Sequence, residues 1–239
     1  MSDDIEANAK LWTKEKSNQE IVISSCIGAN PRSDKLAYFM AGIPGAGKTE
    51  FAKGLQGSPL GNFINIEHDK LVEHIDDYKP KDYYKYRTAG SILVTELFIH
   101  CLKNGYSFIF DGTLSSSRGV ANIRKALNNG YKVIVLYVHQ DIASAWSLTK
   151  DRELDKKRAI SKTGFIKTCK VMNKNLLSIF NIFRDNPNFA FWAVVKNGEP
   201  GTENSKLLLH DSVDEKGNNT NEIEKLLSKD YNIEKIEGL

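Results

Sequence analysis

The chain has 239 residues, of which 41% are hydrophobic and 26% are charged, and its formal net charge is +3. This composition is typical of a globular protein that can bury a sizeable core, and it excludes an intrinsically disordered chain. The 33 cationic residues are nearly balanced by 30 anionic ones. A nucleic-acid partner, which usually requires a concentrated positive excess, is therefore disfavoured, whereas small anionic substrates are compatible.

Short apolar runs alternate with helical patterns along most of the chain. A continuous apolar run of strand length predicts a strand buried on both faces, and apolar side chains at four-residue spacing predict an amphipathic helix. In chain order, these patterns predict a strand at 36–41, a helix at 48–55, a strand at 63–66, a helix at 82–103, a strand at 106–110, a helix at 118–127, a strand at 133–138, helices at 141–157 and 163–184, and a strand at 189–195.

Strands separated by helices favour a parallel sheet, because parallel neighbours need a crossover and the crossover helix covers the sheet. We therefore expect an α/β protein with a P-loop NTPase/kinase fold, built on about five parallel strands with helices on both faces. Residues 1–34 are interpreted as an N-terminal helical extension, 35–196 as the kinase core, and 197–239 as a C-terminal extension packed on the core. In the last segment, a short strand is expected at 207–209 and a helix at 221–227.

The strand at 36–41 leads into a glycine-rich phosphate-binding motif. Residues 42–49 match G-x-x-x-x-G-K-[ST] at every defined position, between a predicted strand and a predicted helix. The glycines allow backbone N–H groups to converge on phosphate, and the helix N-terminus adds partial positive charge. Lys48 is expected to reach the β- and γ-phosphates of ATP or GTP, and Thr49 to bind Mg²⁺. The nucleotide-binding residues are expected to be Gly42, Ile43, Pro44, Gly45, Ala46, Gly47, Lys48, Thr49 and Glu50.

Two other classes of P-loop protein lack support in the sequence. GTPases carry an N-K-x-D motif, but the nearest string, at 173–176, lacks the aspartate and lies in a predicted helix. Transporter-type and AAA-type ATPases place a carboxylate pair after an apolar strand, where this chain has Asp111, Gly112 and Thr113. A kinase is therefore favoured over a hydrolytic motor.

A kinase needs a carboxylate that takes the proton of the attacking hydroxyl, and parallel sheets bind ligands at the carboxyl ends of their strands. Asp69 follows the second predicted strand and is our candidate for this base. Helix capping is the competing interpretation of Asp69. Asp111 follows the third strand, at the same edge, where it is expected to bind substrate hydroxyls or a Mg²⁺-bound water.

Arginines after the fourth strand are candidates for stabilising the charge of the transition state. Arg152 and Arg158 flank a charged helical segment at the position where small kinases carry a cationic lid. A solvated helix surface is the alternative for this segment. Arg87 and Arg118 are weaker candidates for binding an anionic acceptor.

Together these features resemble the zeta toxin family of bacterial toxin–antitoxin systems. The resemblance covers roughly residues 35–195 and is carried by the phosphate loop, the strand end at 66–69, the segment 110–113 and the arginine-bearing region 152–158. It implies a P-loop kinase that transfers the γ-phosphate of ATP or GTP to a sugar hydroxyl of a UDP-activated amino sugar. It also implies a cognate antitoxin protein as a partner.

Residue by residue, the resemblance implies Lys48 and Thr49 at the phosphates and Mg²⁺, and Asp69 as the base. It further implies that Asp111 and Thr113 bind substrate hydroxyls. Arg152 and Arg158 would stabilise the transferred phosphoryl group. Two alternative functions remain open, namely a polynucleotide 5′-hydroxyl kinase or related nucleotide kinase, and an ATP-sensing interaction module.

The remaining side chains give weaker signals. The five histidines have no metal-ligand spacing and are interpreted as structural, with His68 the exception because it adjoins Asp69. The tyrosines at 78, 83, 84 and 86 are expected to pack at a helix start rather than to stack on a ligand. The three cysteines suggest neither a disulfide framework nor a zinc site. Without an evident signal sequence or membrane span, a cytoplasmic protein is expected.

Overall fold

A computed structural model describes residues 2–57, 61–116, 118–156, 160–196, 205–209 and 221–237. Its centre is one sheet of six strands in the order β2-β3-β1-β4-β5-β6. The strands are β1 (Leu36–Ala41), β2 (Ile64–Glu67), β3 (Phe108–Asp111), β4 (Lys132–His139), β5 (Phe189–Lys196) and β6 (Ser205–Leu209). Strands β1 to β5 are all parallel to one another, and β6 pairs antiparallel with β5 at the edge of the sheet. The predicted α/β class with a mainly parallel sheet is confirmed, with one antiparallel strand added at the edge.

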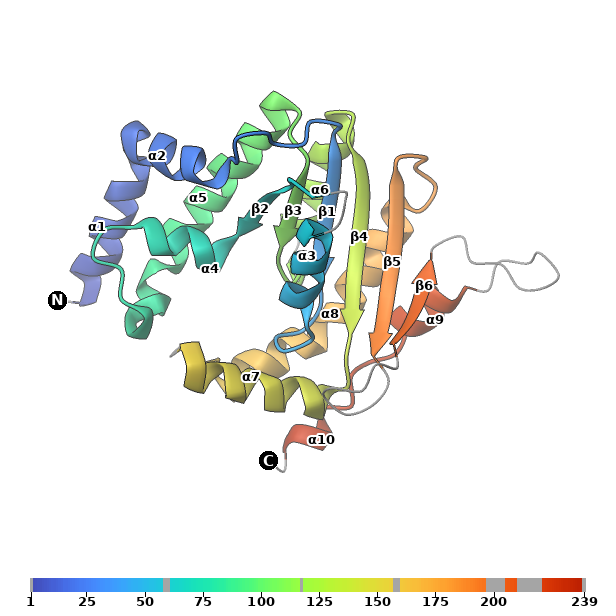
Figure 1. Ribbon diagram of the computed structural model, residues 1–239. Coiled ribbons are helices and arrows are strands. Elements are labelled where there is room, and N and C mark those ends of the chain that lie inside the picture. The colour runs from blue at the N-terminus through green and yellow to red at the C-terminus, as the bar shows by residue number, and fades with distance from the viewer. Residues whose placement is uncertain are drawn as a thin grey trace.

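Helices cover both faces of this sheet (Figure 1). The view of Figure 1 shows α3 in front of the sheet and α6 and α8 behind it, while α7 lies below α3, to the left of the arrowheads of β4 and β5. The longer helices are α1 (Ser2–Lys14), α2 (Lys16–Cys26), α3 (Lys48–Gly57), α5 (Tyr83–Asn104), α6 (Arg118–Asn128), α7 (Ile142–Lys156) and α8 (Lys162–Phe183). The short ones are α4 (His68–Leu71), η1 (Val72–His74), η2 (Pro80–Asp82), α9 (Glu222–Leu227) and α10 (Glu234–Glu237). None of the helices within the described ranges is long and apolar enough to cross a membrane.

An aromatic cluster fixes α5 against the sheet beside the site. Phe39 of β1 stacks on Phe110 of β3, with ring centroids 5.4 Å apart, and Phe98 of α5 meets Phe110 edge-on at 5.6 Å. Phe39 and Phe98 are almost completely buried. Such aromatic pairs contribute about 0.5–1.5 kcal/mol each beyond their buried area. Because β1, β3 and α5 are locked together here, the residues that follow β1 and β3 and those at the start of α5 have fixed relative positions.

Both ends of the described chain pack on the core. Helix α1 lies along α5. In addition, Trp12 Nε1 of α1 donates a hydrogen bond of 2.9 Å to Asp76 Oδ2, in the segment between η1 and η2. At the other end, the hydroxyl of Tyr231 lies 2.7 Å from that of Tyr137 on β4, and Lys235 pairs with Asp141 before α7 at 2.6 Å. The segment that holds the C-terminal helices is therefore connected to the strand end and helix start next to the phosphate loop.

The cysteines are free thiols. Burial raises the pKa of both Cys101 and Cys169 to about 12. Thiols with so high a pKa carry almost no thiolate and are poor nucleophiles. These two cysteines therefore serve as core side chains.

Candidate active site

The phosphate loop connects β1 to α3, as the motif requires. Gly45 and Gly47 have φ angles of +77° and +94°, in the left-handed region that glycine adopts without strain. A Cβ atom on Gly45 would lie 2.0 Å from the carbonyl oxygen of Ala145 on α7, and one on Gly42 would lie 2.7 Å from that of Val138. The loop is therefore packed directly against β4 and α7. Glycine is needed at Gly45 both for the backbone conformation and for this close approach.

Lys48 and Thr49, the first residues of α3, carry the polar groups of the loop. The Lys48 ammonium donates to the carbonyl oxygens of Gly42 and Ile43, at 3.0 and 3.2 Å. The hydroxyl of Thr49 accepts from the guanidinium of Arg152 on α7, at 3.4 Å. In the unliganded site, both residues are thus hydrogen-bonded to groups of the protein itself.

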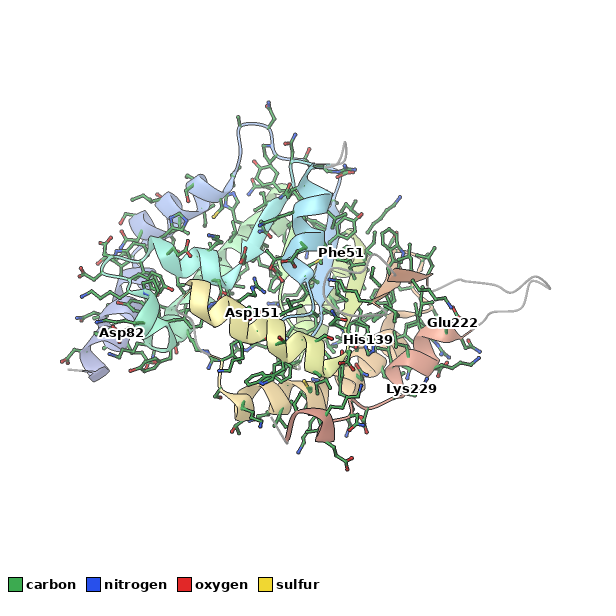
Figure 2. All side chains as sticks on the ribbon, turned by 60° about the horizontal axis from the view of Figure 1, so that its bottom comes forward. Phe51, Asp82, His139, Asp151, Glu222 and Lys229 are labelled. Carbon is green, nitrogen blue, oxygen red and sulfur yellow. The ribbon has the colours of Figure 1, made fainter. Side chains whose placement is uncertain are left out.

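A cavity of about 300 Å³ opens in front of the loop. Figure 2 is turned toward this edge of the sheet, with α7, on which Asp151 is labelled, lying beside α3, on which Phe51 is labelled. The walls of the cavity come from the phosphate loop, the ends of β2 and β3, the first turns of α4 and α5, helix α7 and the segment before α8. They are formed by Pro44, Gly45, Lys48, Thr49, Glu67, His68, Asp69, Tyr83, Asp111, Gly112, Thr113, Thr149, Arg152 and Ile160.

The carboxylates of the site come from neighbouring strand ends. Glu67 and Asp111 are register partners at the last positions of β2 and β3. Asp69 follows in the first turn of α4, whose N-cap is Glu67, so Asp69 is not the capping residue. Its Oδ1 accepts a hydrogen bond of 2.7 Å from the hydroxyl of Tyr83. The cavity therefore combines these acidic groups with the cations of the loop and α7.

Lys48 and Asp111 influence each other's ionisation. Burial lowers the pKa of the Lys48 ammonium, and attraction to Asp111 opposes that effect. Burial likewise raises the pKa of the Asp111 carboxyl; Lys48 acts against the rise, and repulsion from Asp69 adds to it. Each charge is costly to bury without a partner. Without ligand, ionisation of the Asp111 carboxyl therefore costs more free energy in the folded site than in the unfolded chain.

Replacement of Asp111 by asparagine is accordingly expected to stabilise the unliganded protein at neutral pH while lowering activity. Because the folded-state pKa of Asp111 is raised, its ionisation destabilises the fold as pH rises above about 4, where the unfolded carboxyl loses its proton. The gain in Tm should therefore be largest near pH 7 and shrink as the pH is lowered. Thermal unfolding of both proteins across this range measures it, and an asparagine variant less stable than wild type at pH 7 would contradict it.

The remaining predicted site residues differ in their placement. Thr113 lines the cavity, and its hydroxyl lies 2.7 Å from that of Ser115. Arg152 lines the cavity from α7. Arg118 is exposed at the first position of α6 and is not among the lining residues. Arg158 lies outside the residues that the structure describes.

Several side chains at the site were not assigned to it from the sequence, among them Thr149, Ile160, Tyr83 and Lys196. Tyr83 was expected to pack, as Tyr78 and Tyr86 do, with ring centroids 5.1 Å apart, but it lines the cavity and binds Asp69. Lys196, at the end of β5, has its ammonium nitrogen 2.2 Å from where a Cβ of Gly47 would lie. Its position at the carboxyl end of a parallel strand was the one available signal for Lys196.

Comparison with known proteins now identifies the family. The profile of the zeta toxin family matches residues 23–186, a span that includes every residue lining the cavity. No curated protein matches the chain.

Solved structures share the fold. A chain from the PezAT chromosomal toxin–antitoxin system of Streptococcus pneumoniae superposes with a TM-score of 0.59 and 16% identity, covering 75% of this chain and 76% of that one. A chain of the native AvrRxo1-ORF1:-ORF2 complex gives 0.59 and 14%, covering 93% and 72%. The AvrRxo1-ORF1:-ORF2 structure with ATP gives 0.55 and 12%, covering 87% and 64%. At such low identities these likenesses support the fold alone, whereas the profile match reaches across the kinase core: the chain belongs to the zeta toxin family.

Proposed function

We propose that this protein is a kinase that transfers the γ-phosphate of ATP or GTP to a hydroxyl group of a nucleotide sugar of the UDP-N-acetylglucosamine type. The observation that carries the proposal is that one cavity holds both the phosphate-binding residues and the candidate base. This cavity joins Lys48 and Thr49 of a phosphate loop with the carboxylate of Asp69, and Arg152 reaches it from α7. A phosphoryl donor site and a candidate base in one cavity are what transfer to a hydroxyl requires, whereas nucleotide binding alone would need no such base.

In this mechanism the chain mainly positions and neutralises charge. The backbone of residues 42–47 and the ammonium of Lys48 hold the phosphates, and Asp69 takes the proton of the acceptor hydroxyl as its oxygen attacks the γ-phosphorus. The bond from that phosphorus to its bridging oxygen breaks, and the nucleoside diphosphate leaves. Arg152 neutralises charge on the transferred group.

Mg²⁺ fits the residues present. Within the described ranges, His, Cys, Asp and Glu side chains form no group of three that could hold a metal ion. Mg²⁺ commonly binds through few protein oxygens together with phosphates and waters, and the hydroxyl of Thr49 is a suitable oxygen on the cavity wall. When bound with the nucleotide, Mg²⁺ supplies charge neutralisation at the phosphates.

The acceptor class rests on family membership together with the polar groups at the end of β3. Asp111 and Thr113 line the cavity on the side of β3 and are proposed to bind sugar hydroxyls. A cognate antitoxin that covers the nucleotide site is proposed as partner, since the structures of similar fold come from a toxin–antitoxin system and from the AvrRxo1-ORF1:-ORF2 complex. A cytoplasmic location is part of the same proposal.

The test is a transfer assay with γ-labelled ATP or GTP. Purified protein is incubated with each donor and with UDP-sugars, other metabolites or 5′-hydroxyl oligonucleotides, and the label is followed by mass spectrometry. Label on a UDP-sugar supports the proposal. Label on oligonucleotides alone would favour a polynucleotide kinase, and confirmed nucleotide binding without any transfer would favour an ATP-sensing module; either result overturns the proposed acceptor.

Lys196 is expected to contribute to nucleotide affinity, because its ammonium lies over Gly47 of the phosphate loop. The variant Lys196→Met should raise KM for the nucleotide by about tenfold, the effect of losing about 1.4 kcal/mol of binding, with little change in kcat. Lys132→Met, which removes an exposed cation at the start of the neighbouring strand β4, is the matched control. Equal KM values in the two variants would exclude a role for Lys196 at the phosphates.

A further inference from the structure

Behind Asp69, the side chains of Tyr83 and His68 form a row of close polar contacts that the proposed reaction does not yet use. The Tyr83 hydroxyl lies 2.7 Å from Asp69 Oδ1 and 3.1 Å from Nδ1 of His68. The other ring nitrogen of His68, Nε2, lies 2.9 Å from the carbonyl oxygen of Arg87. The row therefore runs from the backbone of α5 through His68 and Tyr83 to the candidate base.

The chemistry of these groups fixes the direction of the hydrogen bonds. A carbonyl oxygen can only accept, so Nε2 of His68 carries a proton, and in the neutral ring Nδ1 is then an acceptor. The Tyr83 hydroxyl has one proton for two acceptors, and the carboxylate of Asp69 is both the closer and the charged one. Tyr83 thus donates to Asp69. Because Nδ1 of the neutral His68 ring is itself an acceptor, it gives no hydrogen bond to the phenol oxygen, and His68 holds Tyr83 through the edge-on contact of the two rings, whose centroids are 5.8 Å apart.

Helix α5 is built to receive the His68 ring. Tyr83, Arg87 and Gly90 follow one another at i, i+4 and i+7, so they lie on one face of the helix. A Cβ atom on Gly90 would lie 2.7 Å from Nε2 of His68, closer than atoms in contact permit. Glycine is disfavoured in a helix interior, and here its lack of a side chain makes the space that the imidazole occupies.

Asp69 needs such a support, because 43% of its side-chain surface is exposed and its cavity side is open. We propose that Tyr83 and His68 are positioning residues for the base: Tyr83 holds Oδ1 of Asp69 and thereby presents Oδ2 to the acceptor hydroxyl, and His68 holds Tyr83. This inference rests on the proposed kinase function and adds to it the residues that orient its base. Neither residue exchanges a proton with the substrate.

The variant Tyr83→Phe removes the hydroxyl and keeps the ring that packs on His68. We expect kcat to fall by about 10- to 100-fold, since misplacing a reacting group by about 1 Å costs up to about 10²-fold, with nucleotide affinity unchanged. Tyr84→Phe is the matched control, because Tyr84 is the next residue and is 64% exposed. Equal kcat values for both variants would overturn the inference while leaving the kinase function in place.

A double variant separates positioning from a general loss of structure. If Tyr83 acts through Asp69, then Tyr83→Phe should cause no further loss of rate in a protein that already carries Asp69→Asn. A merely structural effect would lower the residual rate by the same factor in both backgrounds. In the same way, His68→Phe, which retains an aromatic ring beside Tyr83, should keep more activity than His68→Leu, and equal losses would count against the role of His68.

A measurement without turnover keeps the inference testable if the wild type phosphorylates nothing. The side-chain carboxyl of Asp69 can be titrated by carbon NMR in wild type, Tyr83→Phe and Tyr84→Phe. Loss of a donor to the ionised form should move the Asp69 midpoint to higher pH in Tyr83→Phe alone. Lys48 and Asp111 also act electrostatically on Asp69 and are unchanged in all three proteins. An unmoved midpoint would show that the Tyr83 contact does not hold the carboxylate.

Discussion

Replacing Asp69 by asparagine is expected to lower kcat for phosphate transfer by about 10³-fold, within the range that a general base contributes. Asparagine has nearly the same shape and still accepts from the Tyr83 hydroxyl, which lies 2.7 Å from Oδ1 in the wild type. It cannot take the proton of the acceptor hydroxyl. Transfer to the best acceptor, measured under single-turnover conditions with saturating nucleotide, isolates this step from binding.

Nucleotide affinity provides the internal check on that result. Asp69 lies in α4 and is not part of the phosphate loop, so a fluorescent nucleotide should bind the variant as it binds wild type. Asp185→Asn, at an exposed position beyond α8, controls for the change in net charge. A loss of rate below about tenfold would remove Asp69 from the role of base, and Asp111 would then be the next carboxylate to replace.

The fold could be predicted almost completely, because its signals are local. The apolar run 36–41 coincides with β1, and the predicted helix 163–184 matches α8 within one residue at each end. Apolar side chains in strands buried on both faces leave little ambiguity of type. The segment between β2 and α5 was harder, since α4, η1 and η2 are too short to show periodicity.

The site was predictable only where strand ends or motifs mark it. The phosphate loop has a motif, and Asp69 and Asp111 lie at or just beyond strand ends, so topology alone brings them to one edge. Tyr83 differs, because it reaches Asp69 only through the path that the chain takes between residues 70 and 82. The sequence likewise gives no reason for a glycine at position 90, because the reason is its close contact with the His68 ring in the folded protein. Contacts between distant segments carry no local sequence signal.

The hydrogen bonds of the unliganded site indicate what must change when nucleotide binds. Lys48 donates to two carbonyls of its own loop, and the Thr49 hydroxyl accepts from Arg152. Phosphate oxygens are stronger acceptors than carbonyls, and a metal ion on Thr49 would compete with the guanidinium. We therefore expect Lys48 and Arg152 to exchange these partners for phosphate. The negative charge of the phosphates would also compensate the cost of burying the Lys48 ammonium.

That exchange predicts a large and specific effect at Arg152. Arg152→Ala should lower kcat by about 10³-fold, the lower end of what an arginine at the transferred phosphoryl group contributes. Arg152→Lys should recover only part of the loss, because the ammonium lacks the planar fork that binds two oxygens at once. Lys150→Ala, which removes an exposed cation from the same helix, should leave kcat unchanged.

The ratio of the effects on kcat and KM decides how Arg152 acts. If Arg152 binds charge that develops only in the transition state, kcat and kcat/KM for the nucleotide should fall together. A rise in KM at constant kcat would instead mean that Arg152 binds the ground-state nucleotide. In that case Arg152 would contribute to nucleotide affinity, as is proposed for Lys196. Another cation would then have to stabilise the transferred phosphoryl group. Arg152 contacts Thr49 from α7, which is itself packed on Gly45, so the guanidinium already lies beside the phosphate loop where the transferred group is proposed to bind.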